Sequence, residues 1–206
     1  ATTAKMLHAE GMNIIIHYRS SRESAQALQE ELNTIRKESV VFIQADLHET
    51  AKITEMVREA VKAWGKLDVA VNNASSFYPT PLESATEANW DELIGSNLKG
   101  PYFLCQALAE PLRKCHGSIV NIADIYARSP LKGYSIYCIA KAGNAMMTKA
   151  LAKELAPQVR VNGIAPGVIL WPHTDGQMSE SVKQQVIARV PLQRIGCPVD
   201  IAHVAL

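Results

Sequence analysis

The chain has 206 residues, of which 48% are hydrophobic and 20% charged, a composition typical of a globular protein with a buried core. Its 21 basic and 20 acidic residues nearly cancel, so nucleic acid and anionic membranes are not expected as partners. The longest apolar runs are much shorter than the about 20 residues that a membrane-spanning helix needs.

Short β-branched runs alternate along the chain with longer amphipathic stretches. Strands are predicted at residues 13–18, 39–44, 67–72, 118–123 and 159–164. Helices are predicted at residues 1–11, ending at the helix-terminating Gly11, and at about 24–36, 50–64, 87–112 and 137–155. This alternation predicts an α/β fold, a doubly wound, Rossmann-like parallel sheet flanked by helices.

Both ends of the pattern lack an element that such a fold normally has. No strand precedes the first helix, the helical pattern that opens at Val199 stops at Leu206, and no G-x-G-x-x-G occurs. We therefore expect residues 1–206 to form a single domain without its first strand and its C-terminal strand, these ends being either truncated or disordered.

The four cysteines and six histidines are scattered, with no C-x-x-C pair and no zinc-ligand spacing. We expect free thiols in a reducing compartment, a cytoplasmic protein and no metal site.

Tyr137 and Lys141 stand four residues apart in a predicted helix and therefore share a face. A phenol has a pKa of about 10, and a neighbouring ammonium is expected to lower it. A tuned Tyr137 could then donate a proton during a reduction. Taken alone, Y-x-x-x-K is a weak signal, and a surface lysine beside a packing tyrosine is the more common explanation for it.

Other polar residues follow the strands in a recognisable order. They are Asn72-Asn73-Ala74 after the third strand, Ser96-Asn97 in the long helical region, Tyr137 and Lys141, and Pro166-Gly167 after the last strand. This set resembles the short-chain dehydrogenase/reductase family over essentially the whole chain, apart from the missing glycine-rich turn.

The resemblance implies a role for each matching residue. Tyr137 would be the proton donor, Lys141 would hold the nicotinamide ribose, and Asn97 would anchor a water linked to Lys141. A cofactor cleft would be lined by Asn72, Ala74, Pro166 and Gly167. From the residues alone, Asn72 and Asn73 could simply form a turn, and Asn97 could be a helix-kinking residue bonded to backbone.

Arg19, Ser20 and Ser21 follow the first predicted strand and indicate the cofactor. Dinucleotide folds carry an acid there for the NAD ribose, or an arginine nearby for the 2′-phosphate of NADP. A guanidinium with two hydroxyls suits a phosphate, so we expect NADPH. Asp46 resembles the family position that contacts adenine. A solvated basic loop and a helix N-cap are the alternatives for these two positions.

Asp124 stands where most family members carry serine. A carboxylate there suits a nitrogen heterocycle and disfavours a developing alkoxide, because like charges repel. With segments 72–79 and 133–137, it narrows the resemblance to the pteridine reductases. In these enzymes an aromatic residue matching Phe77 stacks on the pterin; without that match, Phe77 is equally a loop aromatic packed on the core.

The stretch 173–194 looks like a cover for the pocket, with Trp171 touching the substrate, or else like an ordinary peripheral helix. The function expected is NADPH-dependent reduction of dihydropterins, with dihydrofolate as a further candidate. Two alternatives stay open: a carbonyl reductase acting on a ketone or a 3-oxoacyl thioester, and a non-catalytic dinucleotide-binding scaffold. The helices near 90–112 and 137–155 resemble the family's dimer-forming pair, so a homotetramer is expected.

Overall fold

The computed structural model describes residues 1–171 and 179–206. Its strands are β1 (Ile14–Tyr18), β2 (Val40–Gln44), β3 (Val69–Asn72), β4 (Ser118–Ile122) and β5 (Arg160–Ile164). β1 pairs with β2, and β3, β4 and β5 form a second sheet in that order, with every pairing parallel. The predicted strands are therefore confirmed, with ends that differ by one or two residues.

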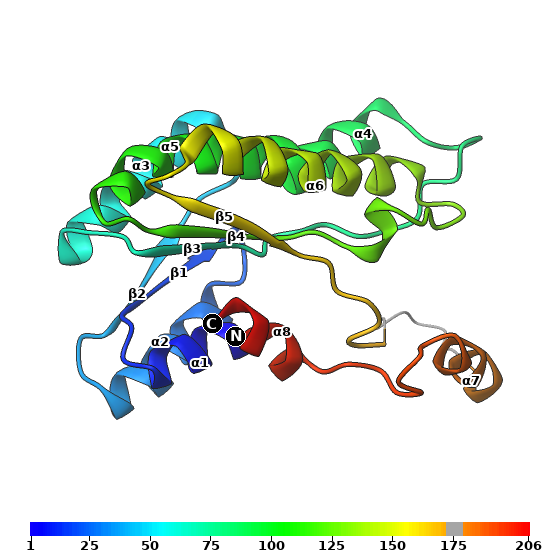
Figure 1. The fold of residues 1–206 in the computed structure, drawn as a ribbon, viewed down its shortest axis with the longest axis horizontal. Helices are drawn as coiled ribbons and strands as arrows, with labels where there is room; N and C mark the ends of the chain where they lie inside the picture. Colours follow the sequence, from blue (N-terminus) through cyan, green and yellow to red (C-terminus); the bar gives the residue numbers. More distant parts are fainter. Residues whose placement is uncertain (172–178) are drawn as a thin grey trace.

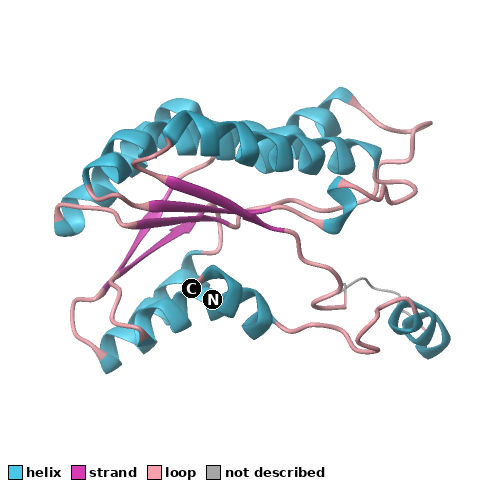
Figure 2. Ribbon diagram, in the orientation of Figure 1, coloured by secondary structure: helices cyan, strands magenta, loops and turns pink. Residues whose placement is uncertain are grey.

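The helices lie on both sides of these strands, as a doubly wound α/β fold requires. They are α1 (Thr2–Ala9), α2 (Arg22–Ile35), α3 (Thr50–Trp64), α4 (Glu87–Ile94), α5 (Gly100–Lys114), α6 (Ser135–Leu155), α7 (Glu180–Ala188) and α8 (Pro198–Ala205). Helices α3, α5 and α6 cover one face, and α1, α2 and α8 cover the other (Figures 1 and 2). The two chain ends lie side by side, because α1 packs on α8.

Two short turns depart from the predicted helices. The stretch expected as one helix near 87–112 is divided by a π-helical turn, η1 (Gly95–Lys99), between α4 and α5. A 3₁₀ turn, η2 (Ile125–Ala127), follows β4. π-helical turns often occur at functional sites, and the hydrophobic periodicity of a sequence does not predict them.

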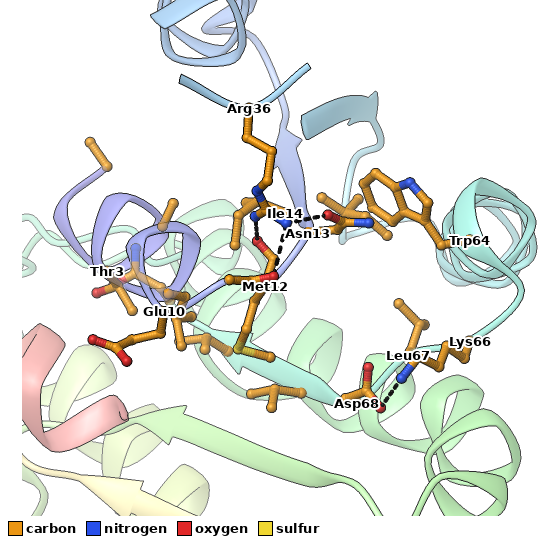
Figure 3. Close-up of a pocket in the computed structure, with 18 residues that line it drawn as sticks. Thr3, Glu10, Met12, Asn13, Ile14, Arg36, Trp64, Lys66, Leu67 and Asp68 are labelled. Atoms are coloured by element: carbon orange, nitrogen blue, oxygen red, sulfur yellow. Dashed lines mark hydrogen bonds and ion pairs between the residues drawn. The ribbon is translucent and has the colours of Figure 1, made fainter. Parts of the chain in front are cut away.

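A groove of about 690 Å³ separates β1 from β3 (Figure 3). Ile14 and Ile15 of β1 line one side, and Val69 and Val71 of β3 line the other. Arg36 borders it by donating to the carbonyl oxygen of Gly11 and to Asn13 Oδ1 at 2.8 and 2.9 Å. Among the described residues no strand bridges the two sheets.

The core that holds the functional elements lies between β4 and the helices on one face of the sheet. Ile119 of β4 and Leu112 of α5 are fully buried there, packed with Leu151 of α6 and Val161 of β5. Burying a side chain of this size contributes about 1.5–3 kcal/mol, so the core fixes where β4 and α6 meet.

The predicted pocket cover is only partly described, because residues 172–178 lie outside the described part of the chain. The helix that follows is α7, and none of its residues is buried. Val182, in this helix, is 41% exposed. The role of α7 as a cover stays a prediction.

Within residues 1–171 and 179–206, no helix combines the length and apolar character needed to cross a membrane. The same residues contain no cluster of three or more His, Cys, Asp or Glu side chains placed to hold a metal ion. All four cysteines are free thiols.

Candidate active site

Helix α6 carries Tyr137 and Lys141 on its buried face. Its buried positions recur every three or four residues, as expected for a helix packed against a sheet; they include Tyr137, Lys141, Asn144, Thr148, Leu151 and Leu155. The Lys141 ammonium lies 5.7 Å from the centre of the Tyr137 ring and donates to the carbonyl oxygen of Ile122 at 2.9 Å. The shared face predicted from the spacing is confirmed.

Asp124 reaches the same place from the end of β4. One carboxylate oxygen, Oδ1, accepts from the backbone N–H of Tyr126 at 2.8 Å and so caps η2. The other, Oδ2, accepts from the Tyr137 hydroxyl at 2.7 Å. The end of β4 and the first turn of α6 therefore join a carboxylate to the candidate proton donor.

The electrostatics of Tyr137 correct the prediction made from the sequence. Burial is the main cause that raises the pKa of Tyr137 above its usual value, and the bond to Asp124 and the charge of Asp124 raise it further. The expected lowering by Lys141 was wrong, because the carboxylate is in direct contact with the phenol oxygen while the ammonium is bonded to Ile122. Tyr137 is thus held as a protonated donor at neutral pH.

The pKa of Lys141 is shifted downward, opposite to that of Tyr137, because burial disfavours the charged form of a base. Burial lowers the pKa of Lys141 to about 8, and the nearby charge of Asp124 partly opposes this effect. The ammonium is therefore present below about pH 8 and is lost as the pH rises through that value. The positive charge of Lys141 is therefore available to the active site only below about pH 8.

Asn97 lies in η1 and is almost fully buried. Its Nδ2 donates to the carbonyl oxygens of Ser76 and Leu93, both at 3.0 Å, and its Oδ1 accepts from the Ser75 hydroxyl at 2.7 Å. Its own carbonyl oxygen accepts from Asn144 Nδ2 at 3.0 Å. The side chain thus faces the segment after β3, and the water linked to Lys141 remains a prediction.

Phe77 belongs to an aromatic group beside the proton donor. Its ring stacks on Tyr134 with centres 4.7 Å apart and meets the Tyr137 ring edge-on at 4.8 Å. Even so, Phe77 is 46% exposed. An exposed aromatic surface next to a phenol donor can bind a flat ring.

Arg19 and Asp46 line a second pocket, of about 460 Å³, at the carboxyl ends of β1 and β2. The backbone N–H of His48 is the main cause that holds the pKa of Asp46 below its usual value, and the His48 side chain and the charge of Arg19 add to it. Ser20 and Ser21 follow Arg19 and are exposed, and the Ser21 hydroxyl makes no capping bond to α2. In an open α/β sheet, ligands bind at the edge formed by the carboxyl ends of the strands, which is where this pocket lies.

For the other predicted cofactor and substrate residues, no described side-chain hydrogen bond leads to Tyr137 or Lys141. Asn72 is buried and donates to Asn121 Oδ1 at 2.7 Å, so its side chain faces the interior. Ala74 and Gly167 are exposed, and the Pro166 carbonyl accepts from the backbone of the residue after Asp124. Trp171 is half-buried, and no described hydrogen bond or aromatic contact joins it to Tyr137.

Two features of the site were missed from the sequence. Ser75 lies in the segment 72–79 and was assigned no role from the sequence, although its hydroxyl donates to Asn97. Asn121 and Asn144 belong to a buried polar network that runs through Thr148 to Asn97. A signal existed for Asn144, which stands three residues after Lys141 on the same helix face.

Comparison with known proteins places this chain in a family. A family model described as enoyl-(acyl carrier protein) reductase matches residues 1–206. A 3-oxoacyl-(acyl-carrier-protein) reductase of Staphylococcus aureus is 36% identical over 202 residues, 97% of this chain and 81% of the relative. Pteridine reductase 1 of Leishmania tarentolae is 34% identical over an alignment 246 residues long, which covers the whole of this chain and 84% of the relative. The chain therefore belongs to the short-chain dehydrogenase/reductase family and is an oxidoreductase.

Proposed function

We propose that this protein reduces dihydropterins with NADPH, and that dihydrofolate is a further substrate. The observation that carries the proposal is the 2.7 Å hydrogen bond from the Tyr137 hydroxyl to Asp124. A carboxylate at this distance from the proton donor repels an oxygen that becomes an alkoxide. It can accept hydrogen bonds from the ring N–H and amino groups of a pterin.

In this proposal the side chains at the end of β4 and on α6 have distinct roles. Tyr137 donates a proton to a pterin ring nitrogen, and Asp124 orients the Tyr137 hydroxyl and binds the pterin. Lys141 supplies the positive charge that offsets the negative charge left on Tyr137, and Asn97 holds the segment after β3 in place. Phe77 stacks on the pterin, with Trp171 at its edge.

The chain has groups that fit the proposed cofactor, which when bound supplies the hydride. The pocket at the ends of β1 and β2 brings Arg19 and Asp46 together, a cation for a phosphate and an acceptor for an adenine amino group. Ser20 and Ser21 add hydroxyls beside Arg19. Nearer the catalytic residues, Lys141 would hold the ribose, and the remaining cleft positions are Asn72 through its backbone, Ala74, Pro166 and Gly167.

A second candidate is reduction of a 3-oxoacyl thioester, because the Staphylococcus aureus relative carries that activity in its name. A purified preparation should therefore be assayed for NADPH oxidation with a dihydropterin and, separately, with an acetoacetyl thioester. We expect a kcat/KM at least about 10-fold higher for the dihydropterin, which corresponds to about 1.4 kcal/mol of transition-state binding. A clear preference for the thioester would contradict the pterin proposal and favour reduction of 3-oxoacyl thioesters as the function.

Replacing Arg19 by glutamate should weaken NADPH binding about 10- to 100-fold, the usual effect of losing a charge-assisted bond to phosphate. The affinity for NADH, which lacks that phosphate, should change much less, and the unmodified protein should prefer NADPH. Fluorescence titration with both cofactors measures this. The control is Arg58→Glu on the exposed side of α3; equal losses for both cofactors in Arg19→Glu would contradict the assignment.

The proposed homotetramer rests on exposed apolar side chains of the two helical regions expected to form it. Trp90 of α4, Tyr102 of α5, and Ile139 and Met146 of α6 are each 43–62% exposed. The proposed cytoplasmic location is consistent with four free thiols.

A further inference from the structure

His48 lies between the pocket at the carboxyl ends of β1 and β2 and the π-helical turn η1, and it has no role in the function proposed above. Its main-chain N–H and its ring Nδ1 donate to Asp46 Oδ1, at 2.9 and 2.7 Å, and Asp46 lines that pocket. Its ring Nε2 donates to the carbonyl oxygen of Glu92, in the last turn of α4, at 3.2 Å. The imidazole therefore joins a pocket residue to the helix that leads into η1.

Both partner oxygens of the His48 ring can only accept a hydrogen bond. The ring satisfies a carboxylate and a carbonyl oxygen together only when both of its nitrogens carry hydrogen, as in an imidazolium beside Asp46. The two bonds from His48 to Asp46 use the same oxygen, Oδ1, and no described hydrogen bond uses Oδ2. Asp46 can therefore hold the ring with one oxygen and a ligand with the other.

Two buried glycines at the ends of η1 allow the segment 46–48 to pack directly on this turn. A Cβ added at Gly95 would overlap the His48 ring and lie 2.7 Å from its Nε2. A Cβ added at Gly100 would lie 2.8 Å from the carbonyl oxygen of Leu47. The segment after β2 thus contacts the turn at both of its ends, and the His48 ring fills the place of a side chain at Gly95.

The turn that is held in this way carries Asn97. Asn97 Nδ2 donates to the carbonyl oxygen of Leu93, the residue after Glu92, at 3.0 Å. It also donates to the carbonyl oxygen of Ser76, in the segment after β3, at 3.0 Å. A continuous set of contacts therefore runs from the cofactor pocket through His48 and η1 to the segment whose aromatic ring lies beside the proton donor.

We propose that His48 is a positioning residue that couples the cofactor pocket to the π-helical turn of the active site. A ligand bound to Asp46 Oδ2 orders the carboxylate, and the carboxylate orders the His48 ring against Gly95 and Glu92. The ring then holds η1, and Asn97 with it, in one arrangement. Coupling of this kind is reciprocal in binding free energy, so an ordered η1 also favours the ligand. The inference rests on the proposed use of the pocket for the adenosine end of NADPH.

The test uses adenosine 2′,5′-bisphosphate, which has the adenine and 2′-phosphate of NADPH but no nicotinamide. Hydrogen exchange of the backbone amides of η1 is measured in the full chain with and without this probe. The probe should slow exchange about five-fold or more, the lower end of the usual coupling between sites. In His48→Ala the probe should still bind but slow exchange less than about two-fold. A purely structural His48 would change exchange equally with and without the probe, and the ratio would stay as in the unmodified protein.

Gly95→Ala tests the same contact without changing His48 or Asp46. Alanine is the better helix former, but its Cβ would displace the His48 ring, so this variant should lose the effect of the probe as well. With saturating NADPH, each single variant should lower kcat about 3- to 10-fold. In the His48→Ala background the overlap is gone, and adding Gly95→Ala should change kcat less than about two-fold further.

His203→Ala is the matched control, because His203 is an exposed histidine on α8, and it should keep the full effect of the probe. If His48→Ala does not fold, as judged by its melting temperature, Gly95→Ala decides the test. Binding of the probe without slower exchange in η1, or equal slowing in His48→Ala, would overturn the coupling and leave the cofactor assignment intact. Calorimetric titration separates this result from failure of the unmodified protein to bind the probe, which would contradict the NADPH assignment of the pocket and the coupling with it.

Discussion

Tyr137→Phe should lower kcat by a factor on the order of 10² or more, the usual contribution of a general acid. The change removes only the hydroxyl, which is the donor in contact with Asp124 Oδ2. The ring would keep its edge-on contact with Phe77 and its buried position on α6, so folding and NADPH affinity should be preserved.

Steady-state assays with the preferred substrate give the loss of kcat, and fluorescence titration gives the NADPH affinity. Near-normal turnover of Tyr137→Phe would mean that the Tyr137 hydroxyl is structural, and the assignment of the active site would fail with it.

Asp124→Ser should lower dihydropterin turnover at least about 10-fold and leave NADPH affinity close to normal. The variant loses the acceptor for the Tyr137 hydroxyl and the carboxylate proposed to bind the pterin. Serine at this position resembles most family members, so the relative rate with the acetoacetyl thioester should rise. If the two substrates lose turnover equally, Asp124 does not select the substrate.

The pH dependence of the same variant provides a second measurement. In the unmodified protein kcat should fall as the pH rises through about 8, where Lys141 loses its proton. Asp124 holds the pKa of Lys141 up against burial, so removing the carboxylate should move this fall to lower pH. Asp91→Ser, at an exposed acid on α4, should leave the profile unchanged, whereas an unmoved profile in Asp124→Ser would show that Lys141 does not set it.

The fold was largely predictable because its signals are local and repeated. Buried parallel strands read as short apolar runs, so β1, β2 and β4 were located to within one or two residues. Helix α3 was predicted with its observed bounds, since its apolar residues recur at helical spacing. The division of the 87–112 stretch by η1 was not predicted, because a π-helical turn adds one residue without changing the residue types.

Within the site, the sequence by itself determined which residues share an element: Tyr137 and Lys141 fall on one face of α6 because a helix repeats every 3.6 residues. Only the tertiary structure decided which of them touch. The contact of Tyr137 with Asp124 joins residues 13 positions apart, and that of Ser75 with Asn97 joins residues 22 apart. A pKa depends on burial and on charges within a few ångströms, so its direction for Tyr137 followed from the packing of β4 against α6 and not from the spacing of Tyr137 and Lys141.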